Sequence, residues 1–197
     1  MKQKKVYLLC GVPGSGKSTW IIKQMKALTD LLISRDNIRF MLVKEDEPYF
    51  SRENEVIEIF NNAIWNATNN EDEIENIFID ATHLTKAARA KATFWVNRDN
   101  VELNCVCFKI PKAVCKERNT QRTGRACVPE TVIDKMFQSF TIPTKEERFD
   151  HVYTVDENGV IESCAIDAIQ GKVAFDANGQ LVAEVGEILS KNELGEN

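Results

Sequence analysis

A glycine-rich stretch near the N-terminus combines the residue types that bind phosphate. GVPGSGKST, residues 11–19, matches the pattern Gly-x4-Gly-Lys-Ser/Thr of a P-loop, between a strand-like run and a helix-like run. Its glycines let backbone amides converge on phosphate oxygens at the positive end of the next helix. The pattern predicts MgATP as the ligand, with Lys17 neutralising the β- and γ-phosphates and Ser18 ligating magnesium. The residues expected to contact the nucleotide are Gly11, Pro13, Gly14, Ser15, Gly16, Lys17, Ser18 and Thr19.

A carboxylate suited to a metal follows a second apolar run. IFIDATHL, residues 77–84, reads as a strand that ends at Asp80. At the C-terminal end of a strand, after a P-loop, such a carboxylate suits the orientation of magnesium or of its water. We therefore expect Ser18 and Asp80 to form the metal site.

The segment SRDNIR, residues 34–39, places Asp36 between two arginines where an apolar run ends. Asp36 could cap the following helix, which contributes about 1 kcal/mol and which Ser, Thr or Asn would do nearly as well. Alternatively, it could accept a proton as a general base, a role that contributes about 10²–10⁴ in rate. Both roles are compatible with one residue.

Three arginines in RNTQRTGR predict a mobile basic lid. Arg118 and Arg122 lie four residues apart and share a helix face, and Gly124 breaks the helix before Arg125. Such a helical hairpin could carry guanidinium groups over a triphosphate, where one arginine can be worth about 10³–10⁵ in rate. The alternative is a solvated basic helix face.

Apolar runs alternate with segments of helical periodicity, which is typical of an α/β fold with a mainly parallel sheet. The expected strands are Val6–Cys10, Leu31–Ser34, Ile77–Asp80, Val101–Ile110 and His151–Val155. The expected helices are Thr19–Leu28, Glu53–Ala67, Thr85–Val96, Lys112–Thr120 and Glu130–Phe140. Thr144 and Glu147 have capping-box spacing. Asn158-Gly159 and Asn178-Gly179 predict hairpin turns in the tail.

Composition restricts the class of protein. The chain has 197 residues, 43% of them hydrophobic, and no apolar run approaches the roughly 18–20 residues that span a bilayer. We expect a cytoplasmic protein without a membrane segment and without a disulfide framework, and we expect Cys105 and Cys107 to be core thiols. The net charge of −5 divides into +2 for residues 1–150 and −7 for residues 151–197, so the body does not repel a nucleic acid.

The order and spacing of GVPGSGKSTW, SRDNIR, IDATHL and RNTQRTGRACVP resemble the kinase domain of phage 5′-hydroxyl polynucleotide kinase over residues 1–150. The resemblance implies that Asp36 is the general base for the acceptor hydroxyl. It further implies that Arg39 contacts the reactive phosphate region, that Arg122 reaches the triphosphate from the lid, and that Thr82 and His83 lie near the acceptor. The implied acceptor is the 5′-hydroxyl end of DNA or RNA, with ATP and Mg²⁺.

The sequence departs from this family in three places. His83 stands where relatives usually have asparagine, which puts the amide contact to the acceptor in doubt. The lid has one more residue between arginine and proline, so Arg122 and Arg125 could exchange roles. No Asp-x-Asp-Gly-Thr signature follows, so no 3′-phosphatase activity is expected.

We accordingly expect a P-loop NTPase-type three-layer sandwich with a helical lid. Residues 1–155 would form the kinase domain, and 156–197 an acidic C-terminal extension rich in β-hairpins. Two alternatives remain open. One is a kinase for a small hydroxyl compound, such as a nucleoside or sugar nucleotide, or a toxin-type kinase of the same superfamily. The other is a non-catalytic nucleotide-binding module whose acidic tail docks a partner. The sequence predicts no oligomeric state.

Overall fold

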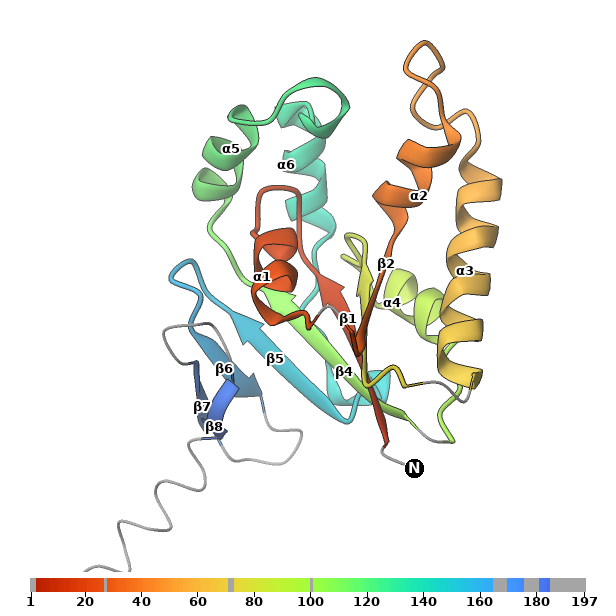
Figure 1. Ribbon diagram of the computed structural model, residues 1–197. Coiled ribbons are helices and arrows are strands. Elements are labelled where there is room, and N and C mark those ends of the chain that lie inside the picture. The colour runs from red at the N-terminus through yellow and green to blue at the C-terminus, as the bar shows by residue number, and fades with distance from the viewer. Residues whose placement is uncertain are drawn as a thin grey trace, which may run out of the picture.

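One continuous sheet organises the chain (Figure 1). The structure is a computed structural model that describes residues 3–26, 28–70, 73–99, 101–164, 170–175 and 181–184. The strand order is β2-β3-β1-β4-β5-β6-β7-β8, and the first five of these strands run parallel. The mainly parallel sheet with helices on both faces confirms the expected fold class.

The strands that carry the polar motifs lie where the sequence predicted them, within two residues at each end. The parallel strands are β1 (Lys4–Cys10), β2 (Asp30–Ser34), β3 (Asn76–Asp80), β4 (Val101–Phe108) and β5 (His151–Val155). Three antiparallel strands follow: β6 (Ile161–Cys164), β7 (Gln170–Phe175) and β8 (Leu181–Glu184).

Six helices connect the parallel strands: α1 (Lys17–Gln24), α2 (Arg35–Leu42), α3 (Glu53–Asn69), α4 (Lys86–Thr93), α5 (Lys112–Thr120) and α6 (Glu130–Ser139). Two short 3-10 helices, η1 (Gly124–Ala126) and η2 (Lys145–Glu147), complete the set. The first helix begins two residues earlier than expected, because Gly16 in the P-loop is already its N-cap. It also ends earlier, at Gln24 and not at Leu28. None of the helices in the described ranges has both the length and the apolar content needed to cross a bilayer.

Each face of the sheet has its own apolar core, because successive strand residues point to opposite faces. On one face, Val6 and Leu8 of β1 pack with Phe60 and Ile64 of α3. On the other face, Leu9 packs with residues of α1 and α5. Cys10, Cys105 and Cys107 belong to the first core and are fully buried, as expected for core thiols.

The turn predictions are confirmed where the structure describes them. Asn158-Gly159 joins β5 to antiparallel β6, with Gly159 at a φ of 77°. Asn178-Gly179 lies outside the described residues. In the expected capping box, Glu147 Oε1 accepts from the backbone N–H of Thr144 at 3.0 Å, whereas the Thr144 hydroxyl bonds to Glu146.

Candidate active site

The P-loop leaves the carboxyl end of β1 and enters α1. Gly14 and Gly16 have φ values of 81° and 92°, a region that favours glycine. A side chain at Gly14 is excluded, because its Cβ would lie 2.3 Å from the carbonyl oxygen of Cys115 in α5. Beyond Gly16, Lys17 and Ser18 begin α1, whose free N–H groups can bind an anion. The loop therefore fits a nucleotide phosphate chain.

The ammonium group of Lys17 is hydrogen-bonded to the backbone of this loop. Its Nζ donates to the carbonyl oxygens of Gly11 at 2.8 Å and Val12 at 3.1 Å. Burial lowers the pKa of Lys17, whereas the charge of Asp80 raises it and that of Arg122 lowers it further. Asp80 and Arg122 line the same pocket as Lys17.

Asp80 ends β3 beside the end of β2, since the register pairs it with Ser34. Ser34 Oγ donates to Asp80 Oδ2 at 3.5 Å. Burial raises the pKa of Asp80, and Lys17 opposes this shift. Together with the exposed hydroxyl of Ser18, this carboxylate supplies the oxygen ligands that magnesium prefers.

Asp36 is not the helix N-cap, so the capping interpretation is wrong. Ser34 caps α2 instead, where its Oγ accepts from the backbone N–H of Asn37 at 3.4 Å. Asp36 lies in the first turn of α2, and its side chain is 65% exposed. The carboxylate is consequently available for a role other than capping.

Arg39 does not line the pocket of Lys17 and Arg122, and its guanidinium binds neighbouring side chains. Its side chain is 5% exposed, and Nε and Nη2 donate to Glu53 at 3.1 and 2.9 Å. Nη1 donates to Asp36 Oδ1 and to the hydroxyl of Tyr49, the latter at 3.2 Å. Tyr49 in turn donates to Asp36 Oδ1 at 3.0 Å. Arg39 therefore orients Asp36, and its Nε, Nη1 and Nη2 atoms all donate to protein side chains.

Glu53 and Tyr49 are site residues that the sequence did not indicate. Glu53 is the first residue of α3 and also forms an ion pair with Arg35. Tyr49 lies in the loop between α2 and α3. Neither belongs to a motif, and only the packing of α2 on α3 brings them to Asp36.

The three lid arginines have different surroundings. Arg118 lies beside the P-loop, where a Cβ at Gly16 would be 3.7 Å from its Nη1. Arg125 donates to the carbonyl oxygens of Val43, at 2.9 Å, and of Lys44, at the end of α2. Arg122 lines the same pocket as Lys17, and its charge lowers the pKa of that lysine. In this structure Arg122 thus shares the pocket of the P-loop lysine, and Arg125 ties the lid to α2.

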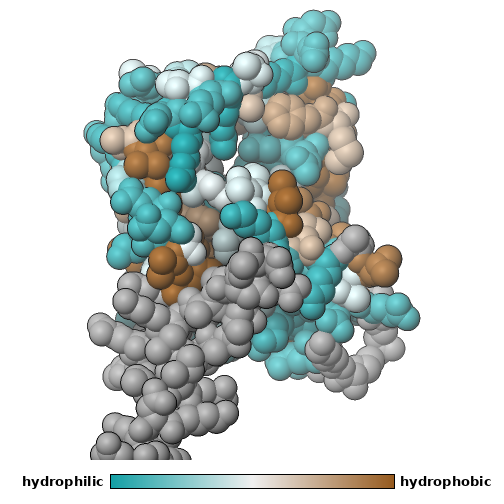
Figure 2. All heavy atoms as spheres, turned by 60° about the vertical axis from the view of Figure 1, so that its left-hand side comes forward, coloured by the Kyte–Doolittle hydropathy of each residue, from teal (hydrophilic) through white to brown (hydrophobic). Residues whose placement is uncertain are grey.

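Most of these residues line one pocket between the lid and the arm formed by α2 and α3, where Figure 2 shows the surface hollowed. The cavity measures about 100 Å³, less than the roughly 300–1,000 Å³ of sites for drug-sized ligands. We conclude that the lid lies close to the arm. The lining residues are Pro13, Lys17, Ser18, Asp36, Phe40, Tyr49, Asp80, Ala81, Thr82, Arg122, Arg125, Ala126 and Val128.

Of the two residues expected near the acceptor, Thr82 lines the pocket and His83 does not. His83 is 6% exposed, and its Nδ1 donates to the carbonyl oxygen of Leu9 at 2.8 Å. Burial lowers the pKa of His83 to about 4. The expected acceptor contact of His83 is therefore wrong, and the residue anchors the loop after β3 to the core.

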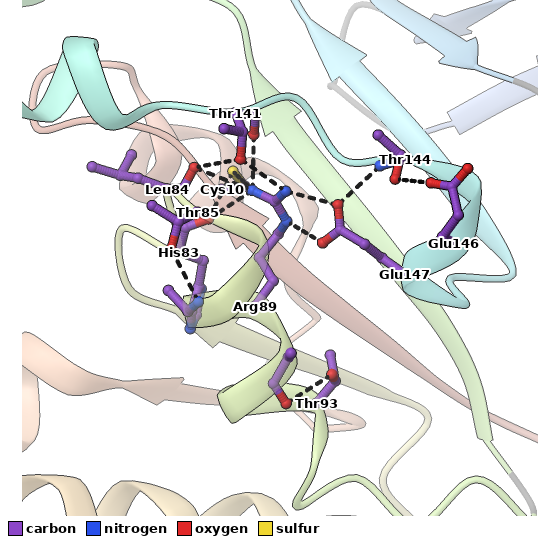
Figure 3. Close-up of polar contacts among 12 residues, drawn as sticks. Cys10, His83, Leu84, Thr85, Arg89, Thr93, Thr141, Thr144, Glu146 and Glu147 are labelled. Atoms are coloured by element: carbon purple, nitrogen blue, oxygen red, sulfur yellow. Dashed lines mark hydrogen bonds and ion pairs between the residues drawn. The ribbon is translucent and has the colours of Figure 1, made fainter.

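A buried ion pair also holds the loop after β3 in place (Figure 3). Arg89 of α4 is 1% exposed and binds Glu147 through Nε at 2.7 Å and Nη2 at 2.8 Å. Its Nη1 also donates to the carbonyl oxygens of His83, Leu84 and Thr141. Arg89 thereby joins the Asp80–Thr82 side of the pocket to the segment that follows lid helix α6.

Several solved structures share the fold of this chain. A gluconokinase from Sinorhizobium meliloti 1021 is 18% identical in sequence, and the match has a TM-score of 0.52. The match covers 79% of this chain and 84% of the gluconokinase chain. A fungal RNA kinase matches with 16% identity, coverages of 79% and 75%, and a TM-score of 0.54. In the Pnkp1/Rnl/Hen1 RNA repair complex the match has 19% identity, a TM-score of 0.56, and covers 90% of this chain but 54% of the other.

Sequence comparison adds the family. No curated protein matches the chain in sequence. A family model described as an AAA domain matches residues 6–143, which include the P-loop, Asp36, Asp80 and the lid arginines. That match covers more than half of the chain and agrees with the P-loop architecture, so the chain belongs to the AAA domain family.

Proposed function

We propose that this protein is a phosphotransferase that moves the γ-phosphate of ATP to the 5′-hydroxyl end of DNA or RNA. The observation that carries the proposal is that Lys17 and Arg122 share one pocket with the carboxylate of Asp36. The two cations suit the triphosphate, and the carboxylate suits a hydroxyl group that must lose its proton. A module that only binds nucleotide has no use for the second group.

The surroundings of Asp36 favour its role as general base. Arg39 and Tyr49 both donate to Oδ1, so Oδ2 is the oxygen left for the proton of the acceptor hydroxyl. As that proton moves to Asp36, the acceptor oxygen bonds to the γ-phosphorus and the bond to the bridging oxygen of ADP breaks. Lys17 and Arg122 stabilise the charge on the transferring group. Ser18 and Asp80 would hold Mg²⁺, which supplies further neutralisation of the phosphate oxygens.

Nucleic acid is the acceptor that the motif order favours. The Arg-Asp-x-x-Arg element and the arginine-rich lid resemble polynucleotide kinases, and the fold is shared with a fungal RNA kinase. The net charge of +2 over residues 1–150 permits contact with phosphates. Because the lid arginines are needed near ATP, we expect recognition of only the last few nucleotides.

A small hydroxyl compound is the second candidate acceptor, and one observation favours it. Arg125 bridges the lid to Val43 and Lys44, and the cavity between lid and arm is small, at about 100 Å³. The fold is also shared with a gluconokinase. A small pocket suits a small acceptor.

Labelled ATP and a panel of acceptors separate these functions. The panel contains a 5′-hydroxyl oligonucleotide, its 5′-phosphorylated counterpart, mononucleosides and gluconate. We expect label on the 5′-hydroxyl oligonucleotide and none on the 5′-phosphorylated one. Far more efficient labelling of a nucleoside or gluconate would replace the polynucleotide with a small acceptor. ATP binding with no transfer to any acceptor would favour a non-catalytic module.

A further inference from the structure

Three aromatic side chains, two of them exposed, form a cluster that begins in the pocket lining, and we name it the aromatic ledge: Phe40, Tyr49 and Phe50. Phe40 is 46% exposed and Phe50 is 67% exposed. The Tyr49 ring lies 6.1 Å from Phe40 and 4.8 Å from Phe50 between centroids, both edge-to-face. Apolar side chains gather on the upper right-hand lobe in Figure 2, below its hydrophilic tip. Contiguous exposed aromatic surface of this kind marks a binding site more often than isolated apolar residues do.

The ledge is continuous with the candidate active site. Phe40 and Tyr49 line the same pocket as Asp36, and the Tyr49 hydroxyl donates to Asp36 Oδ1 at 3.0 Å. The Arg39 guanidinium carbon lies 4.8 Å from the Tyr49 ring centroid and 5.3 Å from that of Phe50, within cation–π range. The buried Arg39 thus holds both rings in place, so a group whose hydroxyl reaches Asp36 has this rigid apolar surface beside it.

The chemistry of the lining favours a nucleobase on the ledge. The polar residues Lys17, Ser18 and Asp80 serve the phosphate end in the proposed function, and the remaining lining includes the apolar side chains of Phe40, Ala126 and Val128. A polyhydroxy acid needs a polar partner for each hydroxyl that loses water, and this surface offers few. A base has a flat π-face, and aromatic rings stack on any base without reading its edges.

The charge around the ledge also argues for stacking. Glu45, Asp46 and Glu47 follow α2 immediately, and Glu45 and Asp46 are exposed. These carboxylates would repel a phosphate backbone that ran along the arm. An acceptor held at this end therefore gains affinity from its base more than from its phosphates.

We propose that the aromatic ledge stacks the base of the 5′-terminal nucleotide of the acceptor, and this inference rests on the proposed function. Stacking on one aromatic ring is worth about five- to 150-fold in affinity. Phe50→Leu should then raise the KM for a 5′-hydroxyl oligonucleotide about tenfold with kcat little changed. Phe50→Trp, which keeps an aromatic ring, should retain the wild-type KM.

An abasic substrate tests the base directly. An oligonucleotide whose 5′-terminal nucleotide lacks its base should already have a raised KM with the wild type, and Phe50→Leu should raise it no further. The matched control is Phe94→Leu, since Phe94 is 76% exposed and its ring contacts Trp95, whereas that of Phe50 contacts Tyr49 of the ledge. The same KM for abasic and intact substrates with the wild type, or an equal effect of Phe50→Leu on both, would overturn the proposal.

A binding measurement without turnover separates this inference from the proposed function. An oligonucleotide with 2-aminopurine at its 5′ end should lose fluorescence when its base stacks on the wild-type protein, and less so with Phe50→Leu. If no oligonucleotide is phosphorylated but this difference persists, the ledge stands and the proposed kinase acceptor is wrong. If 5′-hydroxyl oligonucleotides are phosphorylated while the two proteins quench equally, the proposed function stands and the ledge is wrong. Absence of both quenching and phosphorylation overturns both.

Discussion

His83 is a buried titratable residue whose surroundings predict a pH-dependent stability. Its pKa falls from 6.5 to about 4 because burial disfavours the charged ring. Below pH 6.5 the unfolded chain therefore binds a proton that the folded chain takes up only near pH 4, and stability is lost as the pH falls through this window. We expect a loss of about 2 kcal/mol between pH 7.5 and pH 5 from this residue.

Urea unfolding of the wild type and of His83→Asn at these two pH values measures this contribution. The variant should lose less stability on acidification than the wild type. His151→Asn is the control, since His151 is the other histidine of the chain and is exposed. If His83→Asn and the wild type lose the same free energy of unfolding, the buried His83 does not control this dependence.

The residues of the pocket differ in how far the sequence could predict them. Lys17, Ser18 and Asp80 follow strand ends in recognisable patterns, and the pocket brings all three together with Asp36. Glu53 lies 14 residues from Arg39, outside any motif, and its role depends on the packing of two helices. The sequence also could not show that Arg39 would bind Glu53, because a motif specifies residue types but not the partners of a side chain.

At the scale of elements, the lid and the α2–α3 arm are joined by Arg125. Arg125 lines the pocket, and it forms two hydrogen bonds to the end of α2. Arg125→Ala should release the lid, so that nucleotide enters and leaves faster, by about fivefold for about 1 kcal/mol of lost hydrogen bonding. Stopped-flow binding of a fluorescent ATP analogue gives both rates.

The two rates distinguish a lid contact from a nucleotide contact. A contact that only holds the lid against α2 slows both the entry and the release of nucleotide. A direct contact to a nucleotide phosphate slows release alone. Arg98→Ala is the control, because exposed Arg98 pairs with Asp150 and does not line the pocket. Faster release with unchanged entry would show that Arg125 binds nucleotide directly.

The pair Arg89–Glu147 holds two further elements together and gives a stability prediction. Both side chains are nearly inaccessible, at 1% and 5% exposed. Glu147→Gln would leave the Arg89 charge buried and uncompensated, which should cost about 3–5 kcal/mol in the free energy of unfolding. In the exposed pair Arg52–Glu55, Glu55→Gln should cause no measurable loss in the same denaturant titration. Equal losses in the two variants would contradict the structural role of Arg89.

Element positions were well predicted, because alternation and periodicity are local properties of the chain. The end of β3 at Asp80 and the span of α5 agree with the sequence prediction. The prediction that Asp36 could cap α2 was wrong, because the N-cap is Ser34. Both residue types are good caps, and only the backbone conformation decides between them.

At the scale of the whole molecule, the boundary of the kinase unit can be tested by truncation. We propose that residues 1–155 carry the chemistry and that 156–197 form an extension. β6 nevertheless pairs with β5, and Ile161 is 2% exposed in the core of the α1 face. A chain ending at Cys164 should therefore bind ATP as the full chain does. One ending at Gly159 should lose about 2 kcal/mol of stability with the buried isoleucine.

Calorimetry and urea unfolding of both truncated chains check this boundary. Weaker ATP binding by a folded chain that ends at Cys164 would assign the acidic segment a part in the site. Equal stability of the two truncated chains would mean that β6 adds nothing to the core.

The central claim is that Asp36 is the base of a phosphotransferase whose other half is the P-loop. The most direct test is the initial rate of γ-phosphate transfer to a 5′-hydroxyl oligonucleotide by Asp36→Asn, with the dissociation constant for ATP measured on the same protein. Asparagine keeps the shape of the side chain but cannot accept the proton, and Ser34 still caps the helix. We predict a rate about 10²–10⁴ lower with ATP affinity and stability unchanged. A near-wild-type rate, or a loss of rate matched by an equal loss of ATP affinity, would contradict the account.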